Sequence, residues 1–131
     1  MTDSLLYSDT EEHLANLDHC GSRDLRRAYV AIVIAALRAG YQAIPRPKGA
    51  IRELQIREPE GAQPFAVIVN QNSLLFYLRQ PALRADPDLA EKARAKFAER
   101  LLDDGNSSNE VRIPLRNERD AEDVVEWLFS A

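Results

Sequence analysis

Side chains suited to covalent catalysis or metal binding are scarce in this sequence. Its 131 residues include one cysteine, Cys20, and two histidines, His13 and His19. Because neighbours along a chain seldom reach the geometry of a catalytic dyad, the adjacent Asp18, His19 and Cys20 do not predict a nucleophilic site. His13 lacks a second histidine at helical spacing, so it does not predict a metal site. We therefore expect no catalytic residues, no metal and no cofactor.

The sequence also lacks cysteine pairs, long apolar runs and nucleotide-binding motifs. A single cysteine excludes an internal disulfide and favours a reducing compartment. The longest apolar run, residues 28–37, is ten residues long, whereas a membrane-spanning helix needs about 20. Residues 1–12 are acidic and lack the basic flank and apolar centre of a secretory signal. There is no P-loop, GxGxxG or CxxC motif. We expect a cytoplasmic protein without a membrane partner.

Charge is distributed unevenly along the chain. The net charge is −4, yet residues 23–57 carry eight Lys or Arg against two acids. Residues 1–20 contain no Lys or Arg, and residues 101–131 are strongly acidic. Such asymmetry is typical of a partner-binding surface. The alternative is that the acidic ends fold back over the basic middle of the same chain.

Apolar spacing predicts a single α+β domain over residues 22–131. The acidic segment before it, residues 1–21, is expected to be poorly defined or to form a short helix. Ser22 is a suitable N-cap for a helix over residues 23–39, whose interior is apolar on every side. A helix of this kind must be covered on more than one side, so we expect it to be the core helix.

Two apolar runs, residues 65–70 and 73–79, predict the central hairpin of a sheet. Residues 41–50 contain two prolines and a glycine and are predicted to be a loop. Further strands are predicted at residues 51–58 and 111–115, and further helices after the N-caps Asp86 and Asn117. The order is then α-β-β-β-α-β-α, with a four-stranded mixed or antiparallel sheet covered by helices.

The order α-β-β-β-α-β resembles the core of the PD-(D/E)xK nuclease fold. That family carries a metal-binding carboxylate near the start of its second strand and a (D/E)xK triplet on its third. The corresponding segments, residues 65–70 and 74–79, contain no acid, so they cannot assemble a carboxylate site for Mg²⁺. The resemblance therefore implies a catalytically degenerate, nucleic-acid-binding core. Its predicted contacts with nucleic acid are Arg46, Lys48, Arg52 and Arg79.

Acidic residues surround the only tryptophan, Trp127, in the last predicted helix. Helical spacing places Trp127 off the apolar stripe of that helix, beside Asp120 and Asp123. Tryptophan is enriched among binding hot spots, so this face predicts a partner site. The alternative is that Trp127 lies at the flank of the stripe and packs on a neighbouring loop. The predicted partner-binding residues are Trp127, Asp120, Asp123, Glu126, Asp103 and Asp104.

Small size, acidity and the lack of catalytic residues are typical of bacterial immunity proteins, antitoxins and phage-encoded inhibitors. We expect a non-catalytic module that binds and inhibits or regulates a protein partner, such as a basic nucleic-acid enzyme or toxin. The first alternative is the nucleic-acid-binding module described above. The second is an enzyme with an unrecognised site, for which the candidate residues are Arg46, Arg79, Tyr77 and His19.

Overall fold

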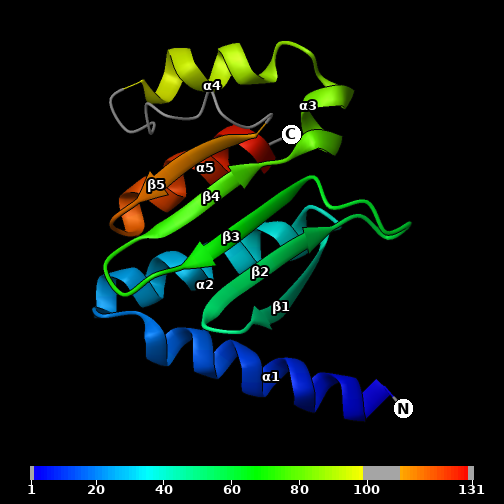
Figure 1. Ribbon diagram of the computed structural model, residues 1–131, viewed down its shortest axis with the longest axis vertical. Coiled ribbons are helices and arrows are strands. Elements are labelled where there is room, and N and C mark those ends of the chain that lie inside the picture. Colours follow the sequence, from blue (N-terminus) through cyan, green and yellow to red (C-terminus); the bar gives the residue numbers. More distant parts are fainter. Residues whose placement is uncertain (1, 99–109, 130–131) are drawn as a thin grey trace.

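A five-stranded antiparallel sheet forms the centre of the protein. The structure, a computed structural model, describes residues 2–98 and 110–129. Consecutive strands are neighbours in the sheet, in the order β1-β2-β3-β4-β5 (Figure 1). Their bounds are β1 (Gln42–Lys48), β2 (Ile51–Arg57), β3 (Phe65–Val69), β4 (Leu74–Leu78) and β5 (Val111–Leu115). The α+β class is confirmed, and the sheet is antiparallel, whereas the prediction of four strands is one strand too few.

The additional strand is β1, which lies in the segment predicted to be a loop. It pairs with β2 alone and forms an edge of the sheet, with Pro45 opposite Leu54 and Pro47 opposite Arg52. Residues two apart in an antiparallel strand direct their backbone nitrogens to the same side. Both prolines therefore direct their nitrogens, which carry no hydrogen, toward the unpaired edge. The prolines exclude a central strand but permit an edge strand.

Among the described residues, five helices accompany the sheet: α1 (Thr2–His19), α2 (Arg23–Arg38), α3 (Gln80–Ala85), α4 (Leu89–Phe97) and α5 (Glu118–Phe129). Helices α2 and α5 pack together behind one face of the sheet, α1 runs beside β1, and α4 runs outside β5 (Figure 1). The acidic N-terminal segment thus contains an 18-residue helix. Helix α3, which the sequence did not predict, has Pro81 in its first turn.

The core lies between the sheet and the pair formed by α2 and α5. Leu54, Val67 and Phe76 occupy one row across β2, β3 and β4 and are fully buried. Phe129 of α5 packs edge-on against Phe65 of β3, with ring centroids 5.6 Å apart. The alternation of the strands therefore presents one continuous apolar face to these two helices.

Helix α2 buries only part of its apolar surface. The Ser22 hydroxyl accepts a hydrogen bond from the backbone nitrogen of Leu25 at 3.1 Å, which confirms the predicted N-cap. Ile32 is completely buried, whereas Val30 and Ile34 are 41% and 42% exposed. The sheet and α5 cover two sides of this helix, as expected for a core helix. Its third side remains exposed to solvent.

Helix α1 is attached to the sheet partly through ion pairs. Asp9 lies 3.9 Å from the guanidinium of Arg46 on β1, and Glu12 lies 3.6 Å from that of Arg52 on β2. The acidic N-terminal end therefore folds back over the basic middle of the chain, one of the two interpretations of its charge asymmetry. Ion pairs that are this exposed contribute little stability, about 0–1 kcal/mol each.

Buried polar contacts also hold α1 against α2. The Tyr29 hydroxyl lies 2.6 Å from Nδ1 of His13 and accepts a hydrogen bond from the Asn16 amide at 3.0 Å. Burial lowers the pKa of His13 and raises that of Tyr29 well above its usual range. Both groups are thus held in their neutral forms at neutral pH.

Glu53 and Gln55 of β2 are polar residues that the alternation of this strand alone would assign to solvent. Both residues are buried, Glu53 to 6% exposure. They lie on the sheet face opposite the core, in register with Ile68 and Ala66 of β3. Because β2 is an interior strand, neighbours on both sides cover polar groups that an isolated pattern assigns to solvent.

A pair of substitutions on α2 tests which side of the helix belongs to the core. Ile32→Asp places an unpaired carboxylate in the interior and is expected to unfold the protein, because its cost of several kcal/mol is comparable with typical domain stability. Ile34→Asp, two residues further on, is the matched control and should leave the thermal midpoint within a few degrees of the wild type. Equal destabilisation of the two variants in thermal unfolding would contradict this account of α2.

The lowered pKa of His13 predicts a dependence of stability on pH. Above its ordinary pKa of about 6.5 the imidazole is neutral in both states. Below that value the unfolded chain binds a proton that the folded protein rejects, so the free energy of unfolding falls until the folded pKa is reached. Denaturant unfolding at about pH 7.5 and about pH 5.5 should show a smaller loss for His13→Gln than for the wild type. The same loss in both proteins would exclude this role for His13.

Candidate protein-binding groove

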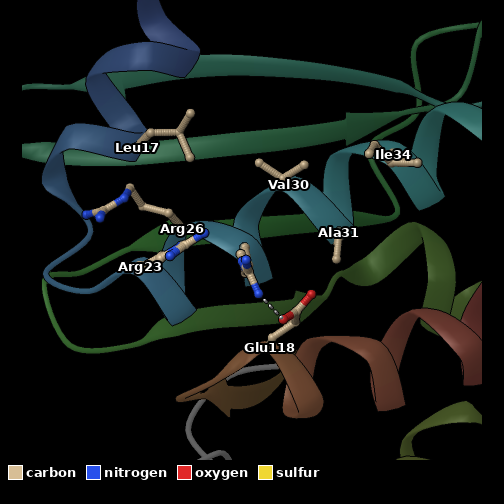
Figure 2. A pocket seen from close by; sticks show the side chains of 8 residues that line it. Leu17, Arg23, Arg26, Val30, Ala31, Ile34 and Glu118 are labelled. Carbon is tan, nitrogen blue, oxygen red and sulfur yellow. Dashed lines mark ion pairs between the residues drawn. The ribbon is translucent and has the colours of Figure 1, made fainter.

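The exposed side of α2 forms the floor of a groove of about 470 Å³. Val30, Ala31 and Ile34 lie along this floor, and Leu17 of α1 contributes a further apolar side chain (Figure 2). Leu37, one turn beyond Ile34 on α2, is 55% exposed and extends the same stripe. Single exposed aliphatic side chains are common, so it is their grouping on one side of α2 that makes this groove a candidate interaction site.

Arginines line one end of the groove. Arg23, Arg26 and Arg27 lie in the first turns of α2, and Figure 2 shows Val30 and Ile34 further along the helix. Arg27 forms an exposed ion pair with Glu118 of α5, at 3.9 Å. Arg23 and Arg26 form no ion pair with any residue in the described ranges. The groove therefore combines an aliphatic floor with an excess of positive charge at one end.

Two short contacts fix the elements that border the groove. The backbone nitrogen of Gly21, between α1 and α2, donates a hydrogen bond to the Gln71 carbonyl in the β3–β4 turn at 2.7 Å. A Cβ atom at Gly21 would lie only 2.7 Å from that carbonyl oxygen, so the approach requires glycine. At the other border, the backbone nitrogen of Glu118 donates to Asp24 at 3.2 Å. The α1–α2 connection is thus held against the β3–β4 turn, and the start of α5 is held against α2.

The predicted acidic surface on α5 is largely engaged in local contacts. Asp120 accepts a hydrogen bond from the Arg116 nitrogen at 3.0 Å, and its own nitrogen donates to Asn117 at 2.8 Å, which confirms the predicted cap. Asp123 forms an ion pair with Arg119 at 3.6 Å. These contacts stabilise the first turns of α5. Glu126 is exposed, whereas Asp103 and Asp104 lie outside the described residues.

Trp127 is partly buried and packs against α4. Its ring meets that of Phe97 edge to face, with centroids 5.3 Å apart. Phe97 is itself 4% exposed. Such aromatic pairs stabilise a fold by about 0.5–1.5 kcal/mol beyond simple burial. This contact supports the alternative in which Trp127 packs at the flank of the helical stripe.

The arginines predicted to contact nucleic acid are each paired with a carboxylate. Arg46 and Arg52 contact acids of α1, as described above, and Arg79 lies 3.0 Å from Glu110 and 3.8 Å from Glu53. Lys48 is the last residue of β1. The pairing removes most of the charge excess that would attract phosphates. These residues do not form a continuous basic surface along the described part of the chain.

Two of the four residues considered for an enzymatic site do come together. Tyr77 and Arg79 line a pocket of about 210 Å³ with Glu53 and Glu110, on the sheet face opposite α2 and α5. Arg46 and His19, the other two candidates, do not line this pocket. Arg79 bridges the two glutamates and also donates to Gln63 at 3.3 Å. The cluster therefore cross-links neighbouring parts of the sheet.

The remaining reactive groups do not form a recognisable centre. Cys20 is buried, and burial raises the pKa of its thiol although the nearby Arg26 partly opposes this shift. Within residues 2–98 and 110–129, no three His, Cys, Asp or Glu side chains are placed to hold a metal ion. No helix in these ranges is both long and apolar enough to cross a membrane.

Sequence reasoning missed the groove because it assigned the whole apolar run of α2 to the core. A signal was nevertheless present in the sequence. Arg23, Arg27, Val30, Ile34 and Leu37 follow one another at spacings of three or four residues, and therefore lie on one side of the helix. On this side of the helix, charged residues come first and apolar residues follow.

Comparison with known proteins identifies no relative: no family model, curated protein or solved structure matches the chain.

The contact between Trp127 and Phe97 predicts a structural role for the tryptophan. Trp127→Ala is expected to lower the free energy of unfolding by about 2 kcal/mol, somewhat less than for a fully buried aromatic residue. Glu122→Ala, on the exposed side of the same helix, is the control and should have a much smaller effect. Denaturant unfolding measures both. Unchanged stability in Trp127→Ala would instead favour Trp127 as a hot spot of the acidic surface.

Proposed function

We propose that the protein is a non-catalytic interaction module that binds, and inhibits or regulates, a protein partner through the groove on α2. The observation that carries this proposal is the exposed stripe Val30, Ile34 and Leu37 on a helix whose other sides are buried. A groove of this kind, apolar in the centre and charged at its border, has the anatomy of a protein interface.

Burial of the stripe by a partner contributes favourably to the free energy of binding. Complete burial of a Val, Ile or Leu side chain contributes about 1.5–3 kcal/mol. Because nearly half of each of the three side chains is still exposed, a partner that covers them gains about 3 kcal/mol in total. The arginines at the end of the groove then supply orientation and partner selection rather than most of the affinity.

The groove is better suited to a partner than the two surfaces inferred from the sequence. On α5, Asp120 and Asp123 already have partners within their own helix or its cap. The arginines considered for nucleic acid are paired with acids. The groove itself is also poorly suited to nucleic acid, because its aliphatic floor offers no aromatic ring on which a base can stack. The acidic face of α5 remains a second candidate surface, for which exposed Glu126 is the residue to substitute.

Binding assays with charge-bearing variants of the floor test the proposal. The partner is first isolated from extracts of the native host on immobilised wild-type protein. Ile34→Asp is expected to weaken its binding by about 30-fold or more, the range of a hot-spot residue. Ile51→Asp is the matched control, because Ile51 is 51% exposed but lies on β2 away from the groove. Binding of the control should remain within about twofold of the wild type.

The variant that loses binding shows which surface the partner covers. Binding that survives Ile34→Asp and is lost in Ile51→Asp would place the partner on the open sheet face, because Ile51 lines the pocket beside Glu53 and Tyr77. Loss in Glu126→Lys alone would place it on α5. Either result rejects the groove as the binding site, provided that thermal unfolding shows all variants to be folded.

A further inference from the structure

The charge of the groove is asymmetric along its length. Its lining contains three arginines and one carboxylate, that of Glu118, which pairs with Arg27. The other nearby acid, Asp24, accepts a hydrogen bond from the Glu118 nitrogen and is thereby engaged toward α5. The uncompensated charge therefore belongs to Arg23 and Arg26, at the end where the α2 dipole is also positive.

The shape of the groove favours a segment of protein over a small ligand. Val30, Ile34 and Leu37 retain 41–55% of their exposure, so the floor is open along its length. Small-molecule sites, by contrast, enclose most of the ligand surface. From Val30 to Leu37 the stripe extends about 10 Å along α2, because each residue of a helix advances about 1.5 Å. This span matches two turns of a second helix laid along the first.

We propose that the groove binds an acidic amphipathic helix of the partner protein. Apolar residues on one side of that helix, spaced i, i+3 or i+4, and i+7, cover the stripe of α2. Carboxylates at one end of the same side lie over Arg23 and Arg26, whose guanidinium groups donate paired hydrogen bonds to the carboxylate oxygens. This inference rests on the proposed function and adds the chemical class of the partner.

The position of the arginines gives the helix a defined placement. Arg23 and Arg26 lie in the first turns of α2, whereas Val30, Ile34 and Leu37 lie in the following turns. A helix whose carboxylates lay at the other end of the groove would bring them over Leu37 and leave both arginines without a carboxylate. In every binder the acidic residues therefore lie over the Arg23 end of the α2 stripe. They stand at the N-terminal or the C-terminal end of the binder according to the direction in which its chain runs.

A displayed library of helical peptides tests this inference without knowledge of the natural partner. The peptides are about 16 residues, or four to five turns, and vary along one face on a neutral background of Ala and Gln. Selection on the wild-type protein is followed by counter-selection on Ile34→Asp. The surviving sequences are expected to carry the apolar spacing given above and an excess of Asp or Glu at one end of it.

Affinity measurements on the selected peptides test the arginines directly. The double variant R23Q/R26Q is expected to weaken binding by about tenfold or more. R84Q/R94Q removes the same charge from exposed positions on α3 and α4 and is the matched control, with an expected change of less than about twofold. Raising the salt from about 50 to about 500 mM should weaken binding to the wild type more than to R23Q/R26Q. Thermal unfolding confirms that each variant is folded.

The outcomes separate this inference from the proposed function. Peptides that depend on Ile34 but lack acidic residues, or that bind R23Q/R26Q as well as the wild type, would reject the acidic helix and leave the groove as a protein-binding site. A selection without any peptide sensitive to Ile34→Asp would reject both. Oleate and a single-stranded oligonucleotide are measured in parallel. Binding of either one that Ile34→Asp abolishes, without such peptides, would assign the groove to that ligand.

Discussion

The packing of α2 against both the sheet and α5 is the constraint on which the rest of the structure depends. Its buried residues, including Ile32, complete the core that the strands begin. The hydrogen bond from Gly21 to Gln71 and that from Glu118 to Asp24 then hold the neighbouring elements at the two borders of the helix. A one-sided layer of helices covers one face of the sheet, and the outward side of α2 is left to solvent.

The same arrangement divides the positive charge of the chain into two groups. Arg46 and Arg52 are paired with acids of α1, so much of the asymmetry in the sequence is compensated within the molecule. Arg23 and Arg26 line the groove together with Leu17 of α1, yet they form no ion pair within the described residues. The exposed apolar stripe begins one turn further along α2. The fold therefore leaves both positive charge and apolar surface uncovered on the same side of α2.

Local chemistry predicted many of the elements correctly. The Ser22 and Asn117 caps, the central hairpin and the strand at β5 all follow from short-range preferences that tertiary contacts reinforce. The loop assigned to the region of β1 was wrong because proline removes a hydrogen-bond donor only on one side of a strand. Whether that side is paired depends on where the strand lies in the sheet, which a local pattern does not contain.

The sequence by itself determined the α+β class, the caps at Ser22 and Asn117 and the central hairpin, because these follow from spacing and backbone preference. The cap predicted at Asp86 was wrong, because α4 begins only at Leu89, after Asp88. Only the tertiary structure decided which side of α2 remains exposed. Residues 28–37 are apolar around the whole helix, so this run alone does not distinguish Ile32, which is buried, from Ile34, which is not. The arginines before it mark the side of Ile34, but they do not show that this side stays uncovered. That choice depends on where α5 and the sheet lie, and contacts between segments distant in sequence determine their positions.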